Sequence, residues 1–135
     1  MTTYRTMLDT NIVSDLIRNA KGRARARLRQ HGDEGICLSI ITAAELRYGA
    51  AKRGSARLLT QVESVLSTID VLAFDVPADE EYGRIRAELE AEGQPIGPTD
   101  LFIVAHARSI GVTLVTHNVG EFGRVRGLKV ENWLE

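Results

Sequence analysis

The sequence of 135 residues lacks several features, and each absence excludes a class of protein. A single cysteine, Cys37, allows neither an internal disulfide nor a CxxC pair, so we expect it to be a small core residue. The longest apolar stretches, GICLSII and LFIVA, are far too short to cross a bilayer. The N-terminus, MTTYRTMLDT, lacks the basic-then-apolar order of a signal peptide, which predicts a cytoplasmic protein with no membrane partner.

Phosphate-binding loops and common catalytic motifs are also missing. There is no GxxxxGK[ST] loop and no GxGxxG turn, which excludes the usual nucleoside triphosphate and dinucleotide sites. The GxSxG elbow of many hydrolases is absent too. The three histidines, His31, His106 and His117, lack zinc-like spacing, and only His117 falls near the site predicted below. An aspartyl-phosphate mechanism through Asp9 would lack a suitably placed lysine.

The composition is typical of one globular domain spanning residues 1–135. With 44% hydrophobic and 26% charged residues, the chain is large enough to bury a core without disulfides or a structural metal. The net charge is −1, but basic and acidic residues are unevenly distributed along the chain. Residues 1–60 hold 11 basic and 5 acidic side chains, whereas residues 61–135 hold 6 basic and 13 acidic side chains. Only 3 of the 17 basic residues are lysines, and the planar fork of arginine suits phosphate. The densest basic stretch, residues 19–32, is either a solvated helix or a phosphate-contacting surface.

Hydrophobic periodicity predicts short strands that alternate with helices. We expect helices over 11–19, 22–31, 42–54, 55–69, 77–93 and 98–110, and strands over 4–8, 36–40, 70–76 and 112–116, with a last short strand within 128–134. Strands separated by helices cannot form hairpins, so the fold class is α/β, with a mainly parallel central sheet and helices on both faces. Ligands of such sheets bind beyond the carboxyl ends of the strands.

Three carboxylates, Asp9, Glu45 and Asp100, fall at that end of the predicted sheet. Each also has a purely structural explanation. Asp9 follows the first strand and can cap the next helix, and Glu45 fits a capping box in which Thr42 is the cap. Asp100 follows Gly97 and Pro98 in IGPTD, so it lies in the first turn of a helix, near the positive end of the helix dipole.

Together the three acids point to a bound cation, because a cluster of like charges is costly without one. Mg²⁺ prefers oxygen ligands and usually needs only one or two direct carboxylates. We therefore expect Asp9 and Asp100 to be direct ligands. Glu45 would act at a second ion or through water, helping to orient a hydroxide for attack on phosphorus.

Four motifs occur in order over essentially the whole chain: MLDTNIVS, ITAAELRYGA, IGPTDLFIVAHA and LVTHNVGEF, followed by VENW. Together they resemble the PIN-domain nucleases, and specifically the VapC toxins of bacterial toxin–antitoxin pairs. The resemblance implies a PIN-like three-layer sandwich and a Mg²⁺- or Mn²⁺-dependent endoribonuclease, with Asp9, Glu45 and Asp100 as its acidic set. It also implies a homodimer that is silenced by a cognate VapB-type antitoxin. Within the family, sequences that carry motifs like GPTD and THNVGEF resemble toxins that cut initiator tRNA in the anticodon region. The resemblance therefore implies tRNA as the RNA substrate.

The chain departs from the fullest family pattern at one position. Many relatives carry a fourth acid where this chain has Asn118, in the segment Thr116, His117, Asn118. Asn118 can still hydrogen-bond a water or a phosphate, but it adds no charge. Glu121 either replaces the missing acid or faces solvent. We expect one tightly held ion and a second that arrives with RNA.

Two other classes of function remain open at this point. The chain could bind RNA or a protein without cutting, with its carboxylates serving only as helix caps. It could also be a metal-dependent phosphatase acting on small esters. Metal dependence separates the nuclease from the binding module, and a preference for oligonucleotides separates it from the phosphatase.

Overall fold

The computed structural model describes residues 3–32 and 34–135, which are built around a five-stranded sheet. The strand order is β3-β2-β1-β4-β5, and each neighbouring pair is parallel, which confirms the predicted parallel sheet. The strands are β1 (Thr6–Leu8), β2 (Ile36–Ser39), β3 (Asp70–Leu72), β4 (Thr113–Val115) and β5 (Val130–Glu131). Because β1 lies in the middle, the segments that follow β1, β2 and β4 are neighbours at the carboxyl edge.

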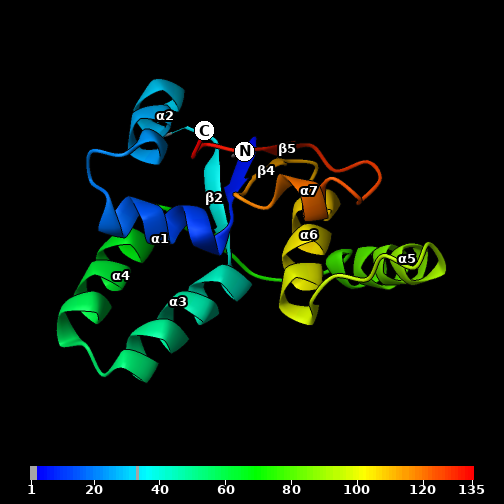
Figure 1. Cartoon of the computed structure of the whole chain (residues 1–135), viewed down its shortest axis with the longest axis horizontal. Coiled ribbons are helices and arrows are strands. Elements are labelled where there is room, and N and C mark those ends of the chain that lie inside the picture. Colours follow the sequence, from blue (N-terminus) through cyan, green and yellow to red (C-terminus); the bar gives the residue numbers. More distant parts are fainter. Residues whose placement is uncertain (1–2, 33) are drawn as a thin grey trace.

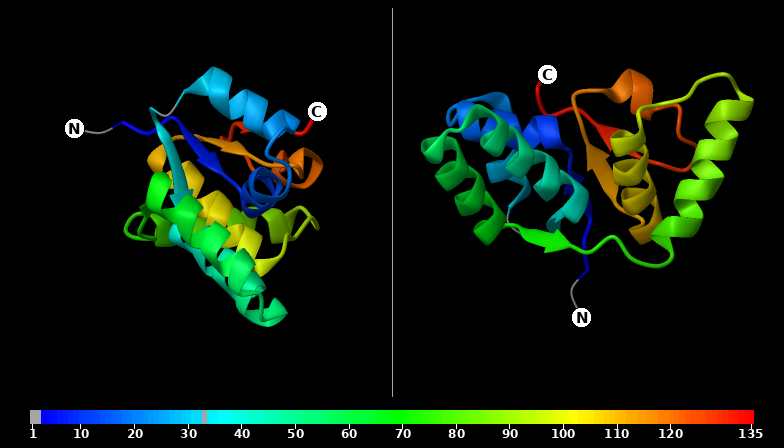
Figure 2. Two further views of the ribbon diagram at one scale, coloured as in Figure 1. Left: turned by 90° about the vertical axis from the view of Figure 1, so that its left-hand side faces the viewer. Right: turned by 90° about the horizontal axis from the view of Figure 1, so that it is seen from below.

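Helices occupy both faces of the sheet (Figures 1 and 2). They are α1 (Thr10–Arg18), α2 (Arg23–His31), α3 (Ile40–Arg53), α4 (Ala56–Thr68), α5 (Ala78–Ala91), α6 (Pro98–Ile110) and α7 (Val119–Phe122). The first six lie within about two residues of the predicted bounds, and the single turn α7 was not predicted. Within the described residues, no helix is both long and apolar enough to span a membrane.

Side-chain alternation along the strands divides the interior into two cores. Met7 of β1 packs into a cluster with α5 and α6, whereas the next residue, Leu8, packs into a cluster with α1, α2, α3 and α4. The same alternation separates Leu114 from Val115 in β4. Cys37 is fully buried in the first of these cores, as predicted, and burial raises the pKa of its thiol to about 12. The result is the expected arrangement of helix layer, sheet and helix layer.

The start of α3 corrects one prediction. Ser39, the last residue of β2, is the N-cap, and its hydroxyl accepts a hydrogen bond from the backbone N–H of Ile41 over 3.1 Å. Thr42 therefore lies inside the helix, where its hydroxyl is buried and has no hydrogen-bond partner among the described residues. The capping box between Thr42 and Glu45 was wrong, because the chain passes from strand to helix without a loop. Glu45 is consequently free of that structural role.

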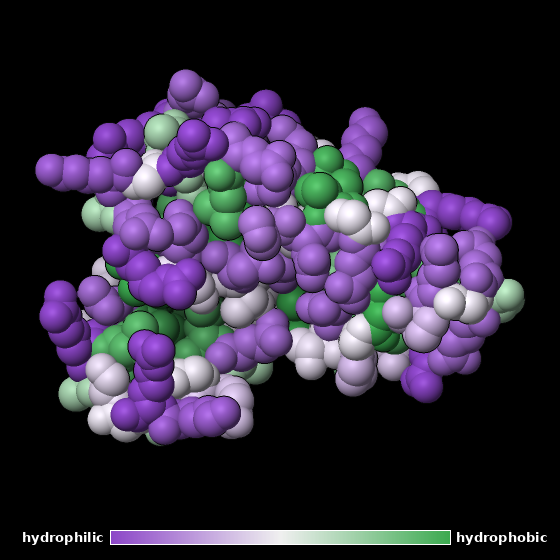
Figure 3. Space-filling model, in the orientation of Figure 1, coloured by the Kyte–Doolittle hydropathy of each residue, from purple (hydrophilic) through white to green (hydrophobic). Residues whose placement is uncertain are grey.

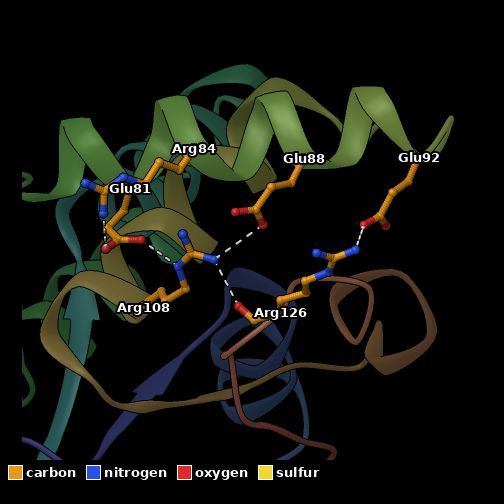
Figure 4. A network of polar contacts seen from close by, with 6 residues as sticks. All are labelled: Glu81, Arg84, Glu88, Glu92, Arg108 and Arg126. Carbon is orange, nitrogen blue, oxygen red and sulfur yellow. Dashed lines mark hydrogen bonds and ion pairs between the residues drawn. The ribbon is translucent and has the colours of Figure 1, made fainter.

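Helices α5 and α6 form an antiparallel pair, which an ion-pair network ties to the loop after α7 (Figure 4). The side chain of Arg108 on α6 is only 15% exposed, and its Nε lies 2.5 Å from Glu81 Oε2. Its guanidinium also lies 3.8 Å from Glu88 and donates to the carbonyl of Arg126 over 2.9 Å. Arg126 in turn pairs with Glu92 over 2.5 Å. The network braces α6, the helix that carries Asp100.

Candidate functional site

The predicted site residues Asp9, Glu45, Asp100 and Asn118 line one open cavity of about 400 Å³ at the carboxyl edge of the sheet. Asp9 directly follows β1, Asn118 lies just beyond β4, Glu45 is on the second turn of α3, and Asp100 is on the first turn of α6. Four residues of α1 complete the lining: Thr10, Asn11, Ser14 and Arg18. The structure thus brings together side chains that are up to 109 positions apart in the sequence.

Asp9 is the most buried of the acids, at 3% exposure, and hydrogen bonds hold it in place. Its Oδ1 accepts from the backbone N–H of Thr10 over 2.8 Å. Its Oδ2 accepts from the Thr116 hydroxyl over 2.8 Å and from the Asn11 amide over 3.2 Å. Burial raises the pKa of Asp9, the hydrogen bonds from Thr116 and Thr10 oppose the rise, and the charge of Glu45 adds to it. The carboxylate is therefore fixed in position and costly to ionise in the absence of a cation.

Glu45 reaches the cavity from α3 and is tied to α1. The hydroxyl of Thr10 donates to Glu45 Oε1 over 2.5 Å. Because Thr10 also donates its backbone N–H to Asp9, this residue joins the two acids. Among residues 3–32 and 34–135, no hydrogen bond engages the second carboxylate oxygen of Glu45, which is available to a ligand.

Asp100 is the least restrained of the acids. Burial raises its pKa to about 6, and the charges of Asp9, Glu121 and Glu45 contribute in that order. Within the described part of the chain, no hydrogen bond lowers the pKa of this carboxyl group. Ile103, Val104 and Ala107 further along α6 are fully buried and anchor the helix beneath it.

The segment after β4 is bonded to the segment after β1. The backbone N–H of His117 donates to Asn11 Oδ1 over 3.0 Å, and that of Asn118 donates to the Thr116 hydroxyl over 3.0 Å. The side-chain amide of Asn118 donates to Glu121 Oε2 over 3.2 Å. Glu121 therefore lies against the site instead of facing away, and its charge acts on Asp100.

Sequence reasoning missed the contribution of α1. Its apolar side chains, Ile12, Val13 and Leu16, are buried, so the opposite face of the helix is turned to the cavity. Asn11, Ser14 and Arg18 follow one another at helical spacing on that face, and this polar stripe was the signal in the sequence. Arg18 is notable because it brings a cation to the edge of an acidic cavity.

The donor chemistry of the site fits a hard divalent cation. Three repelling carboxylates, two of them with raised pKa, line one cavity and leave oxygen lone pairs unused. In the conformation described for residues 3–32 and 34–135, no three histidine, cysteine or carboxylate side chains are close enough together to enclose a metal by themselves. A cation here would therefore keep part of its shell as water or substrate oxygen.

Comparisons with known proteins agree with this arrangement. The model of the PIN domain matches residues 6–128. A protein of Shigella flexneri named tRNA(fMet)-specific endonuclease VapC is 44% identical over 128 residues, covering 94% of this chain and 96% of its own. Ribonuclease VapC2 of Haemophilus influenzae is 41% identical over 129 residues, which cover 95% of this chain and 97% of that protein.

Solved structures show the same fold. The chain superimposes with a TM-score of 0.89 on DNA-bound VapBC from Salmonella typhimurium, at 40% identity, covering 97% of this chain and 99% of that one. The TM-score is 0.87 for VapBC2 from Rickettsia felis bound to a DNA fragment from its promoter, at 35% identity and with coverage of 95% and 98%. This chain therefore belongs to the PIN-domain family and, within it, to the VapC proteins.

Proposed function

We propose that this protein is a metal-dependent endoribonuclease whose catalytic acids are Asp9, Glu45 and Asp100. The observation that carries the proposal is the convergence of these carboxylates, from three separate elements, on one cavity at the carboxyl edge of the sheet. A helix cap needs no such convergence. The nuclease names of the VapC relatives support the same reaction.

Counting lone pairs indicates how the acids would share a Mg²⁺ or Mn²⁺ ion. A carboxylate offers about four acceptor positions, and Asp9 uses three of them within the protein. Asp9 thus has one position left for a cation, whereas no hydrogen bond within the described part of the chain uses the acceptor positions of Asp100. Glu45 has one oxygen free, beyond its bond with Thr10. When bound, the ion would stabilise the charge that develops on the scissile phosphate.

The remaining polar residues would handle the substrate. Arg18 lies at the edge of the cavity, where its guanidinium would hold an RNA phosphate near the acids. Asn118 lines the cavity and can hydrogen-bond a water or a phosphate oxygen. Glu121 would act as the fourth acid, because it is bonded to Asn118 and raises the pKa of Asp100.

We propose tRNA, and the initiator tRNA in particular, as the substrate in the cytoplasm. The support is the printed name of two relatives, from Shigella flexneri and Salmonella typhimurium, that are 44% and 41% identical to this chain. The motif style GPTD and THNVGEF supports cleavage in the anticodon region.

A VapB-type antitoxin is the proposed partner, and a second cavity offers it a docking surface. This cavity, of about 750 Å³, lies at the amino ends of β1, β2 and β3, away from the acids. Its apolar lining comes from α1, α2 and α4, through Leu16, Leu28, Val65 and Ile69. On the face of the molecule seen in Figure 1, hydrophobic patches interrupt the mainly hydrophilic surface (Figure 3). The VapBC titles of the structural relatives support a protein occupant.

A homodimer is proposed as well. Ile40 and Tyr48 on α3 and Val76 before α5 are large apolar residues that are 44%, 66% and 77% exposed. Large apolar residues that are this exposed are typical of a surface that a second copy covers.

The test is cleavage of total tRNA by purified protein in Mg²⁺, in Mn²⁺ and in EDTA. Asp100→Asn is the informative variant because no hydrogen bond among the described residues depends on that carboxylate, and Glu80→Gln, an exposed acid of α5, is the matched control. We expect metal-dependent fragments from the wild type and the control only. Equal cleavage by Asp100→Asn, or cleavage in EDTA, would refute the metal-dependent site. RNA binding without fragments would favour the binding module, and hydrolysis of small esters alone would favour the phosphatase.

A further inference from the structure

A buried hydrogen bond joins the two helices that carry Glu45 and Asp100. The imidazole Nδ1 of His106 on α6 lies 2.7 Å from the hydroxyl of Ser39, the N-cap of α3. Ser39 is fully buried and His106 is 2% exposed. The ring of Phe74 packs edge-on against the imidazole, with 5.5 Å between ring centroids. The contact is therefore shielded from water. In such an interior a hydrogen bond is strong, and its loss is costly.

The hydrogen-bond partners favour one assignment, in which the Ser39 hydroxyl donates to Nδ1. The Ser39 hydroxyl already accepts from the backbone N–H of Ile41, and its own proton needs an acceptor. An unprotonated Nδ1 supplies that acceptor, which leaves the ring proton on Nε2. Burial lowers the pKa of His106, so the neutral ring that this arrangement requires is the favoured form. Ser39 thus caps α3 and binds α6 with the same oxygen.

A change in this hydrogen bond would move the Glu45 and Asp100 carboxylates, because both lie further along the helices that it joins. Glu45 lies six residues beyond Ser39 on α3, and Asp100 lies six residues before His106 on α6. At 1.5 Å per residue, each acid is about 9 Å along its helix from the bond. A tilt of about 10° between the helices at this point would displace a carboxylate by roughly 1.6 Å. A misplacement of about 1 Å can reduce a reaction rate about 100-fold.

We propose that the Ser39–His106 hydrogen bond is a positioning element that sets the separation between the Glu45 and Asp100 carboxylates. The proposal rests on the proposed function, since it assigns these two acids to one cation. Neither Ser39 nor His106 lines the cavity of the acids, as far as the described residues define it, so both act only through the helices that they join.

The experiment compares three His106 and Ser39 variants with a control for stability alone. His106→Leu removes the bond, and His106→Asn keeps a polar atom near the position of Nδ1. Ser39→Ala removes the bond from the other side. Val62→Ala, on α4 and 1% exposed, destabilises the core on a helix that carries none of the acids. Each variant is measured for kcat and KM on RNA, for Mn²⁺ affinity by calorimetry, and for thermal unfolding.

We expect His106→Leu to lower kcat at least about 10-fold and to weaken Mn²⁺ binding, with KM for RNA nearly unchanged. His106→Asn should recover most of both losses. The double variant of Ser39 and His106 should lose no more than either single variant, because both remove the same bond. Val62→Ala should lose stability but keep kcat and Mn²⁺ affinity.

Two results would overturn the inference. One is His106→Leu behaving like Val62→Ala, with lower stability but normal kcat and Mn²⁺ affinity. The other is additive losses in the double variant. A failure of the proposed function looks different, because the wild-type protein would then cleave no RNA. In that case the Mn²⁺ affinities of the variants still decide whether the bond positions the acids.

Discussion

Replacing Asp100 by asparagine should make the metal-free protein more stable at neutral pH while abolishing its nuclease activity. The carboxyl pKa is raised from an ordinary value of 3.8 to about 6, because the group is partly buried and faces Asp9, Glu121 and Glu45. A raised pKa means that the folded protein holds this proton more tightly than the unfolded chain does. The associated stability is present at low pH and is lost as pH rises through about 6. Asparagine is neutral at every pH, so the variant does not lose stability in this way as pH rises.

The size of the effect follows from the raised pKa. A difference of about two pKa units corresponds to about 3 kcal/mol of unfolding free energy above pH 7. Solvent screening of a partly exposed group reduces this to about 1.5 kcal/mol. Asparagine also loses the favourable interaction of a charge with the start of α6, which is worth about 0.5 kcal/mol. The net gain for Asp100→Asn is therefore about 1 kcal/mol, or about 3–5 °C in Tm for a chain of this size.

Urea unfolding in EDTA at pH 7.5 and pH 4.5 measures this gain directly. We expect the full gain at pH 7.5 and a clearly smaller one at pH 4.5, where Asp100 is protonated in the folded wild type but still ionises on unfolding. Added Mn²⁺ should then stabilise the wild type and leave the variant unchanged, because only the wild type retains the cation site. A gain of equal size at both pH values, or a loss at pH 7.5, would refute the electrostatic account of this site.

Three further predictions follow from the same structure. The kcat/KM for RNA should rise with pH through about 6 and level off above about 7, since Asp100 must be ionised to hold a cation; a flat pH–rate profile from 5 to 8 would contradict this. Arg108→Met should destabilise the protein by about 1–3 kcal/mol in urea, because it leaves Glu81 only its longer 3.9 Å contact with the exposed Arg84. Arg86→Gln on the exposed face of α5 should cost less than about 0.5 kcal/mol. Cys37 should react with a thiol reagent only on unfolding, because burial raises its pKa to about 12, and prompt native labelling would show that β2 opens readily.

Local signals in the sequence were sufficient to place two of the acids. Asp9 follows a strand whose apolar run ends at Leu8, and Asp100 follows the Gly97-Pro98 helix start, so both positions depend on short-range patterns. Strands that are separated by helices pair in parallel, and the carboxyl ends of parallel strands share one edge of the sheet. The layered fold and the meeting of these acids could therefore be predicted from the sequence alone.

Tertiary contacts decided the features that were missed. The spacing of Thr42 and Glu45 is a correct local motif, but β2 ends at Ser39, which pairs with Leu72 of β3, and the Ser39 side chain caps α3 there. The turn α7 has only four residues and no periodicity, so nothing in the sequence indicated that it would carry Glu121 to the site. The bond between Ser39 and His106 joins residues 67 positions apart, which no local pattern reveals.

The unequal attachment of Asp9 and Asp100 to the fold has an evolutionary consequence. Three donors hold Asp9, and an asparagine there would set its own N–H groups against those of Asn11. No donor among the described residues holds Asp100, so an asparagine there leaves the fold intact. A cell lineage harmed by this nuclease would therefore escape most easily through Asp100. The surviving gene would encode a folded, harmless protein that still occupies the antitoxin.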